Sequence, residues 1–467
     1  MLRCGSYQYS GHTMLTLLRK ILILFCLSVI SLFALAYWGL GYSPVYLYNA
    51  PSVATGMGAK LACSGRYVSG YNRLAIAADI RVYSPILGLL DYQYNDVQQT
   101  VSASLLGVKS RSASFQPGIG CAIDYPGVST RQTLRWPVLR APQAAWPRGS
   151  AVVSVDPAIQ SRLDTLLASD NAAGHDTRAL LIAYRGRVVA ESYSTGVDKN
   201  TPLIGWSMTK SVNSLLLGHL VMAGKVNVAE NDLFPTWHKD VRADISIRDL
   251  LQMTDGLDYQ EDYDPGDTAV RMLFQEPDAA DYVLRRPQLR APGRHFNYSS
   301  GSANLLSRII QDRIEGDEQA DLNYLVDGFF RPLGLTSATF EMDASGQLMG
   351  STYLYATARD WAKVGQLMLN GGEINGTRLV SQQWVADSTQ PNGSDNEKAY
   401  GYQWWLNRGD SLVRWPDLPG NTYAARGNRE QRLMVFPDAE LVIVRLGWSP
   451  SDYPDNQNFK QILDWFN

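Results

Sequence analysis

The chain has 467 residues, of which 45% are hydrophobic and 19% charged, and this length predicts about three structural units. Lys and Arg number 42 against 45 Asp and Glu, so the net charge of −3 excludes the strong positive field of a dedicated nucleic-acid-binding protein. The 39 glycines and 22 prolines are spread among apolar segments without a fixed repeat, which excludes a collagen-like chain, a solenoid and a propeller.

The N-terminus carries a long uncharged apolar segment. Arg19 and Lys20 precede residues 21–40, which contain no charged side chain. About 20 such residues suffice to cross a bilayer, and basic flanking residues stay on the cytoplasmic side. We therefore expect residues 1–42 to form a cytoplasmic tip and a single-pass inner-membrane anchor, with the remainder exported to the periplasm. A signal peptide cleaved near Ala34-Leu-Ala36 and a buried core helix are the alternatives.

Four cysteines are present, and only Cys63 and Cys121 follow the apolar segment. Two thiols are enough for one disulfide in an oxidising compartment, and we expect this pair to be bridged. Two buried free thiols are the alternative. No CxxC pair and no Cys/His ligand spacing occurs, so we expect no structural zinc.

The exported part divides near residue 150. Residues 43–150 contain short apolar stretches, such as 74–82, that are interrupted by Pro and Gly, and a proline-containing linker from Arg135 to Gly149 closes them. We expect residues 43–150 to form a loosely organised N-terminal region and linker. This region either covers a cleft or spaces the following domain, residues 151–467, from the membrane.

Secondary-structure signals are clear from residue 151 onward. We expect a helix, a β-hairpin, a mostly helical region, a second hairpin and a last helix. The segments that carry the first helix, the two hairpins and the last helix are 157–168, 179–184 with 188–193, 432–436 with 441–446, and 458–466. Strands at both ends predict an α+β fold with one antiparallel sheet made from both termini of the domain and a helical region inserted between them. A site is expected in the cleft between sheet and helices.

The segment Gly205-Trp-Ser-Met-Thr-Lys-Ser211 precedes a well-patterned helix. Ser207 at the helix start and Lys210 one turn later share a helix face. A serine hydroxyl becomes a nucleophile when a base takes its proton, and a lysine serves when burial and nearby positive charge lower its pKa. The helix N-terminus offers backbone donors for a developing oxyanion. A capping serine with a solvated lysine is the alternative, because Ser-x-x-Lys also arises by chance.

A second motif, Phe296-Asn-Tyr-Ser-Ser-Gly301, again precedes a helical stretch. Tyr298 could relay a proton to a leaving group, and Ser300 could bond the substrate or Lys210. The alternative for Tyr298 is a loop aromatic that packs its ring.

Four segments in order carry a family resemblance: Ser207-Met-Thr-Lys210, Leu250 to Tyr259, Tyr298-Ser-Ser300 and Thr357-Ala-Arg-Asp360. Together they resemble the serine β-lactamase and penicillin-binding-protein superfamily. The closer likeness is to its class C-like esterases and 6-aminohexanoate-dimer (nylon oligomer) hydrolases, over roughly residues 150–467. The resemblance implies the β-lactamase/transpeptidase-like fold and an acyl-enzyme mechanism without a cofactor. Ser207 would attack the carbonyl, Lys210 would act as general base, and Tyr298 would shuttle the proton.

The resemblance also implies substrate-binding residues. Tyr263 is similar to the tyrosine that closes over the substrate amide in nylon-oligomer hydrolases, with a packing aromatic as the alternative, and Ser300 is expected to touch the substrate. Gly427 and Gln431 match the Gly-x-x-Gly-Gln pattern before the last hairpin, but Glu430 stands where a glycine is usual. The missing Lys-Thr-Gly motif argues against potent β-lactamase activity.

We therefore expect an exported serine hydrolase that cleaves an ester or amide bond of a small molecule, a short peptide or an amide oligomer. It is expected to need no cofactor or metal and to bind no nucleic acid. A non-hydrolytic, acyl-capturing sensor or binding module of the cell envelope is the alternative. An α/β-hydrolase that uses His295 is a further alternative, and it is disfavoured because this sequence lacks the second glycine of the Gly-x-Ser-x-Gly motif. A metal hydrolase lacks ligand spacing among His219, His238 and His295.

Overall fold

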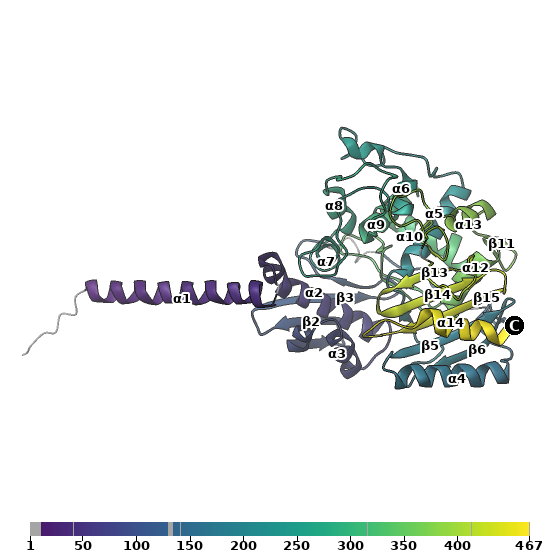
Figure 1. The fold of residues 1–467 in the computed structure, drawn as a ribbon, viewed down its shortest axis with the longest axis horizontal. Helices are drawn as coiled ribbons and strands as arrows, with labels where there is room; N and C mark the ends of the chain where they lie inside the picture. The colour runs from purple at the N-terminus through teal and green to yellow at the C-terminus, as the bar shows by residue number, and fades with distance from the viewer. Residues whose placement is uncertain are drawn as a thin grey trace, which may run out of the picture.

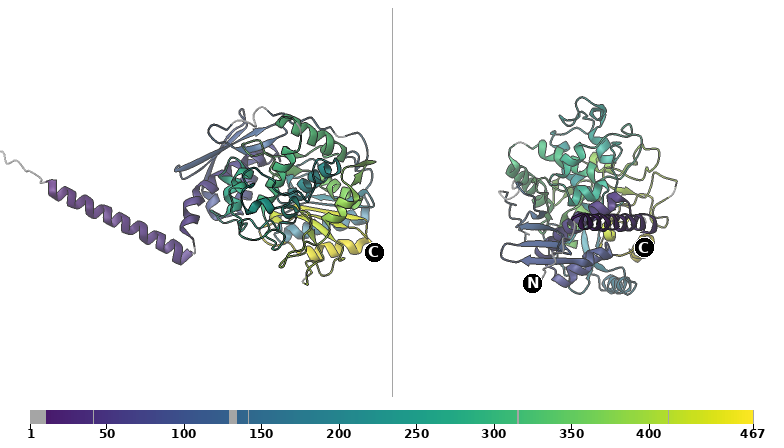
Figure 2. Two further views of the ribbon diagram at one scale, coloured as in Figure 1. Left: turned by 90° about the horizontal axis from the view of Figure 1, so that it is seen from above. Right: turned by 90° about the vertical axis from the view of Figure 1, so that its left-hand side faces the viewer.

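The structure, a computed structural model, describes residues 11–40, 42–128, 134–140, 142–314, 316–411 and 413–466. The first described element, α1 (Gly11–Leu40), extends away from the body of the molecule as a single helix (Figures 1 and 2). Residues 1–10, which belong to the predicted cytoplasmic tip, lie outside the described residues.

The predicted localisation requires a correction. Within the described ranges, no helix is both long enough and apolar enough to cross a membrane. The prediction of a single-pass inner-membrane anchor over residues 21–40 is therefore wrong.

Residues 44–123 form a helix-and-sheet unit, which we call the N-terminal module. A long helix, α2, packs on a four-stranded antiparallel sheet of order β1-β2-β3-β4. The elements are α2 (Pro44–Tyr67), α3 (Arg73–Arg81), η1 (Pro85–Leu89), β1 (Leu90–Asn95), β2 (Thr100–Leu105), β3 (Lys109–Gln116) and β4 (Gly120–Ile123). A disulfide between Cys63 and Cys121 joins α2 to β4, as the sequence predicts.

The module is more regular than the sequence predicts. In β2, alternate residues Val101, Ala103 and Leu105 are buried while their neighbours are half-exposed, which is the period-two pattern of a strand with one covered face. Because one inward residue is an alanine and the outward ones are serines and a threonine, the hydrophobic alternation is weak in the sequence. The small side chain of Ala103 lets α2 approach the sheet closely, since a Cβ on Gly58 of α2 would lie 3.3 Å from the Ala103 Cβ.

The second unit, residues 151–466, is built on a six-stranded antiparallel sheet of order β12-β13-β14-β15-β5-β6. Its strands are β5 (Thr177–Tyr184), β6 (Arg187–Tyr193), β12 (Trp405–Leu406), β13 (Tyr423–Gly427), β14 (Gln431–Phe436) and β15 (Leu441–Gly447). Pairing of β15 with β5 places the end of the chain beside the start of the unit. The predicted antiparallel sheet made from both termini, with helices inserted between them, is confirmed.

Helices cover both faces of this sheet (Figure 1). On one face, α4 and α14 enclose a core with alternate residues of the strands, and on the other face α12 and α5 contact the sheet. The helices of this unit are α4 (Pro157–Ala172), α5 (Met208–Met222), α6 (Ile247–Gln252), α7 (Thr268–Phe274), α8 (Ala279–Leu284), α9 (Ser300–Asp312), α10 (Glu318–Leu325), α11 (Arg331–Leu333), α12 (Ala358–Leu369), α13 (Gln382–Ser388) and α14 (Asp455–Leu463). Short strands complete the unit: β7 (Leu203–Ile204), β8 (Thr339–Phe340) and β9 (Leu354–Ala356) form one sheet, and β10 (Glu373–Ile374) and β11 (Thr377–Arg378) form another.

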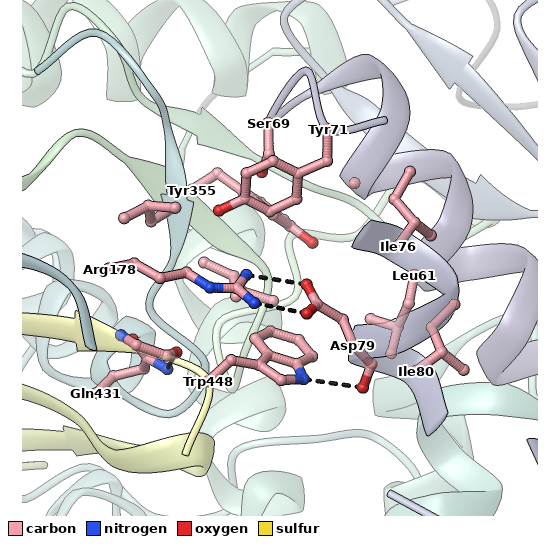
Figure 3. Close-up of a pocket in the computed structure, with 14 residues that line it drawn as sticks. Leu61, Ser69, Tyr71, Ile76, Asp79, Ile80, Arg178, Tyr355, Gln431 and Trp448 are labelled. Carbon is pink, nitrogen blue, oxygen red and sulfur yellow. Dashed lines mark hydrogen bonds and ion pairs between the residues drawn. The ribbon is translucent and has the colours of Figure 1, made fainter. Parts of the chain in front are cut away.

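Two ion pairs connect the N-terminal module to the second unit. Lys60 of α2 pairs with Glu341, and both side chains are almost fully buried. At a second point, Arg178 of β5 forms a two-pronged pair with Asp79 of α3, whose backbone oxygen also accepts a hydrogen bond from the Trp448 indole at 2.9 Å (Figure 3). One hydrophobic core runs through both units. The domain boundary near residue 150 stays a prediction.

Candidate active site

Ser207 lies on a tight turn between β7 and α5. The preceding residue, Trp206, has a left-handed φ of 48°, a conformation that costs about 1–3 kcal/mol in a non-glycine residue and is typical of functional sites. Ser207 is the N-cap of α5, yet its side chain makes no capping hydrogen bond. Its hydroxyl is therefore available to Lys210, one turn further along the helix.

Lys210 is a buried base candidate aimed at the serine. Its Nζ lies 2.9 Å from the Ser207 Oγ, 2.9 Å from the Ser300 Oγ and 3.0 Å from the backbone oxygen of Ser351. Burial lowers the pKa of Lys210 to about 8, while the Glu261 carboxylate, 3.9 Å away, acts in the opposite direction. A substantial fraction of this lysine is thus neutral slightly above neutral pH and can accept a proton.

Glu261 anchors the network around the lysine. It accepts hydrogen bonds from the Ser300 hydroxyl at 2.6 Å and from the Tyr263 hydroxyl at 2.9 Å, and it also accepts one from the Ser300 backbone N–H. Its side chain is only 5% exposed. Glu261 therefore fixes Ser300 and Tyr263 relative to Lys210.

Tyr298 approaches the serine from the neighbouring loop. Its ring stacks on Trp405 with centroids 5.3 Å apart, and the Lys210 Nζ lies 4.8 Å from its ring centre. Burial and the Glu261 charge raise the pKa of Tyr298 well above its usual range, whereas its hydrogen bond with Ser207 acts in the opposite direction. The phenol is thus protonated at neutral pH and can pass a proton to an atom held beside Ser207.

A cavity of about 520 Å³ opens onto Ser207 and Ser300. Tyr263 lines it, and this residue is 45% exposed and has a left-handed φ of 64°. The structure thus brings Ser207, Lys210, Tyr298, Ser300 and Tyr263 together. Their positions agree with the roles that the sequence predicts, and those roles stay predictions.

Of the two remaining predicted substrate-binding residues, Gly427 lies beside the nucleophile turn, whereas Gln431 does not line the cavity. Gly427 ends β13 directly beside the nucleophile turn, because a Cβ on it would lie 2.1 Å from the backbone oxygen of Gly205. Gln431 is buried and lines a different pocket, the one drawn in Figure 3. Its amide exchanges hydrogen bonds with the backbone of Gly447 and also donates to Asn428 and Arg429. The structure does not bring the Gln431 side chain to the cavity wall.

The unusual Glu430 belongs to the turn between β13 and β14. It has a left-handed φ of 67°, pairs with Arg432 and accepts a hydrogen bond from the Tyr453 backbone N–H at 3.3 Å. The neighbouring Arg429 places its guanidinium 4.0 Å from the ring centre of Tyr83, in the N-terminal module. Both residues line the cavity, and both charges have partners.

Sequence reasoning missed two contributions to the site. Glu261 lies in the segment that resembles the nylon-oligomer hydrolases, but nothing in the sequence distinguishes it from its neighbours. Its contribution becomes visible only in the structure, where it lies beside Ser300 and Lys210, which are distant in the sequence. The other contribution is a set of apolar side chains from α2 that lines the cavity and that no sequence motif predicts. Across the described ranges, no group of three or more His, Cys, Asp and Glu side chains could hold a metal ion.

Comparison with known proteins agrees with the fold. Residues 163–457 match the Beta-lactamase family. The 6-aminohexanoate-dimer hydrolase of Paenarthrobacter ureafaciens is 28% identical over 305 residues, which cover 60% of this chain and 73% of that protein.

Two solved structures share the fold. One, from Bacillus anthracis and described as a 6-aminohexanoate-dimer hydrolase, has a TM-score of 0.54 at 19% identity, covering 72% of this chain and 88% of that one. The other, EstCE1, a hydrolase with promiscuous acyltransferase activity, has a TM-score of 0.55 at 16% identity, covering 66% of this chain and 97% of that one. With its matching domain, its α+β fold and its hydrolase relatives, this chain belongs to the beta-lactamase family and is a hydrolase.

Proposed function

We propose that this protein cleaves an ester or amide bond of a small-molecule or short amide substrate through an acyl-enzyme on Ser207. The observation that carries the proposal is the 2.9 Å contact between the Ser207 Oγ and the buried Nζ of Lys210. A relative that hydrolyses the 6-aminohexanoate dimer and a structural neighbour with acyltransferase activity support acyl transfer as the reaction class.

In the proposed reaction, neutral Lys210 takes the Ser207 proton as Oγ attacks the carbonyl carbon. The Ser207 backbone N–H at the start of α5 stabilises the oxyanion, together with the edge of β13 at Gly427. Tyr298 gives its proton to the leaving atom as the carbonyl carbon's bond to that atom breaks, and it regains a proton from Lys210. Water then attacks the acyl carbon. The bond between that carbon and the Ser207 Oγ breaks, and a proton from the water returns to the Ser207 oxygen.

A labelling experiment tests this proposal. The whole chain is incubated with a fluorophosphonate probe and, separately, with p-nitrophenyl acetate, beside Ser207→Ala. We expect wild type to be labelled and to turn over many equivalents of ester, and the variant to be silent in both assays. Labelling without turnover would favour the acyl-capturing module instead. An equally active Ser207→Ala protein would contradict the assignment of the nucleophile.

The pH dependence follows from Lys210. The neutral lysine is the active base, and burial lowers its pKa to about 8, so kcat/KM should rise with pH through about 8 and level off above it. In Glu261→Gln, the charge that raises this pKa is removed, so the rising limb should move to lower pH. The measurement is a pH profile of kcat/KM with p-nitrophenyl acetate.

Asp262→Asn serves as the control for this shift. Asp262 is the exposed neighbour of Glu261 and lines the same cavity, so its variant should keep the wild-type profile. If the rising limb of the Glu261→Gln pH profile stays at the wild-type pH or moves to higher pH, this result would contradict the electrostatic coupling between Glu261 and Lys210.

A further inference from the structure

The N-terminal module supplies one wall of the cavity that opens onto Ser207. Ala50, Val53, Ala54 and Met57 of α2 line this cavity, and their spacing of three and four residues places them on one helix face. All four are at most 8% exposed. They precede residues 163–457, the part of the chain that matches the Beta-lactamase family.

Helix α7 adds further apolar side chains to the lining of this cavity. Val270, Leu273 and Phe274 of α7 line the same cavity and are also buried, and α7 packs against α2. We call the part of the cavity that these two sets of side chains line the α2–α7 slot. Three carboxylates that line the cavity, those of Asp262, Asp264 and Asp452, are exposed and therefore lie at its rim, and the fourth, that of Glu430, is paired with Arg432. A bound group that reaches into the slot meets hydrocarbon rather than charge.

The ion pairs described above hold this wall in place. Lys60 lies on α2 within one turn of Met57, and its partner Glu341 also accepts hydrogen bonds from Ser64 at 2.8 Å and from the Cys121 backbone at 2.7 Å. Because these contacts are buried, α2 is a fixed part of the cleft. The slot is therefore a preformed site of the kind that binds small apolar groups.

The position of Tyr298 indicates which part of a substrate enters the slot. The leaving atom must face the Tyr298 hydroxyl to receive its proton, and Tyr298 is not among the residues that line the cavity. The substrate portion that occupies the cavity is accordingly the acyl group, which is the part transferred to Ser207.

We propose that the α2–α7 slot binds the apolar acyl chain of the substrate, so that the N-terminal module makes the enzyme selective for esters and amides of aliphatic acids longer than acetate. This inference rests on the proposed acyl-enzyme mechanism. The carbonyl carbon forms its bond to the Ser207 Oγ, the leaving group departs with a proton, and the hydrocarbon chain stays in the slot until water releases the free acid.

The test is a chain-length series with the whole protein. We expect kcat/KM for p-nitrophenyl esters to rise from acetate to octanoate by up to about fourfold per methylene, the factor that corresponds to burying a methylene group. Ala54→Leu, which fills the slot, should lower kcat/KM for octanoate at least tenfold and leave that for acetate within about twofold. Met57→Ala, which widens the slot, should move the optimum to longer chains.

Ser52→Leu is the matched control. Ser52 lies on the same helix, is half-buried and does not line the cavity, so its variant should keep the wild-type series. A wild-type series without chain-length preference would overturn the inference, and so would an Ala54→Leu variant that loses acetate and octanoate turnover equally. A preference seen only among acetate esters of longer alcohols would assign the slot to the leaving group and overturn it too. If wild type neither reacts with the fluorophosphonate nor cleaves acetate, the acyl-enzyme proposal itself fails, and this inference with it.

Discussion

Replacing Ser207 with alanine is expected to lower kcat for p-nitrophenyl esters by a factor on the order of 10⁵–10⁶, as removal of a nucleophile does in serine hydrolases. Lys210→Ala should lower kcat by at least about 10³, because the serine then lacks the base within 2.9 Å of its Oγ. The two effects should not add in the double variant, since both residues serve one step. Steady-state kinetics of the three variants measure this directly.

Lys239→Ala is the control for a changed lysine. Lys239 is exposed, and its variant should keep kcat within about twofold of wild type, since surface changes away from the site have small effects. Lys210→Arg sharpens the test, because a guanidinium keeps its proton at any pH of the assay and cannot act as the base. A Lys210→Arg protein with wild-type kcat would contradict the base role even if Ser207→Ala is inactive.

Glu341→Gln is expected to destabilise the folded protein by about 3–5 kcal/mol, the usual effect of breaking a buried ion pair from one side. The loss arises because the Lys60 charge stays buried without its carboxylate, while the side chains of Lys60 and Glu341 are 3% and 0% exposed. Urea denaturation followed by tryptophan fluorescence gives the change in the free energy of unfolding.

Glu373→Gln provides the comparison for this effect. Glu373 pairs with Arg378 at 2.9 Å, but the two side chains are 45% and 37% exposed, so its loss should cost less than about 1 kcal/mol. Adding Lys60→Met to Glu341→Gln removes the stranded charge and should recover part of the stability. Equal losses for Glu341→Gln and Glu373→Gln would show that the buried pair does not hold the module in place.

The parts of this structure that the sequence predicts are those governed by local spacing. Ser207 and Lys210 lie three residues apart at a helix start, so their contact follows from helix geometry alone. The two hairpins are marked by apolar runs on either side of a tight turn, as at Arg185-Gly186, where both residues have positive φ. The joining of these hairpins into one sheet followed from strands at both ends of the domain.

Contacts between distant segments account for what the sequence did not predict. Glu261 and Lys210 are 51 positions apart by number, yet their side chains lie 3.9 Å from each other, and no local pattern distinguishes Glu261 from the acidic residues beside it. The α2 wall depends on pairing of Lys60 with Glu341, which are 281 positions apart. Gln431 shows a related limit, because residue type alone does not say whether an amide points toward a cleft or bonds a neighbouring strand.

Gly205 and Gly427 meet with no side chain between them, since a Cβ on Gly427 would lie 2.1 Å from the Gly205 backbone oxygen. The spacing between the nucleophile turn and the edge of the sheet is therefore set by two backbones in direct contact. Natural variation can remodel the walls of the cleft, such as α2 and the turn at Glu430, without altering that spacing. The geometry of the reacting centre therefore rests on main-chain contact, whereas single side-chain substitutions in the cleft walls can change which substrate fits.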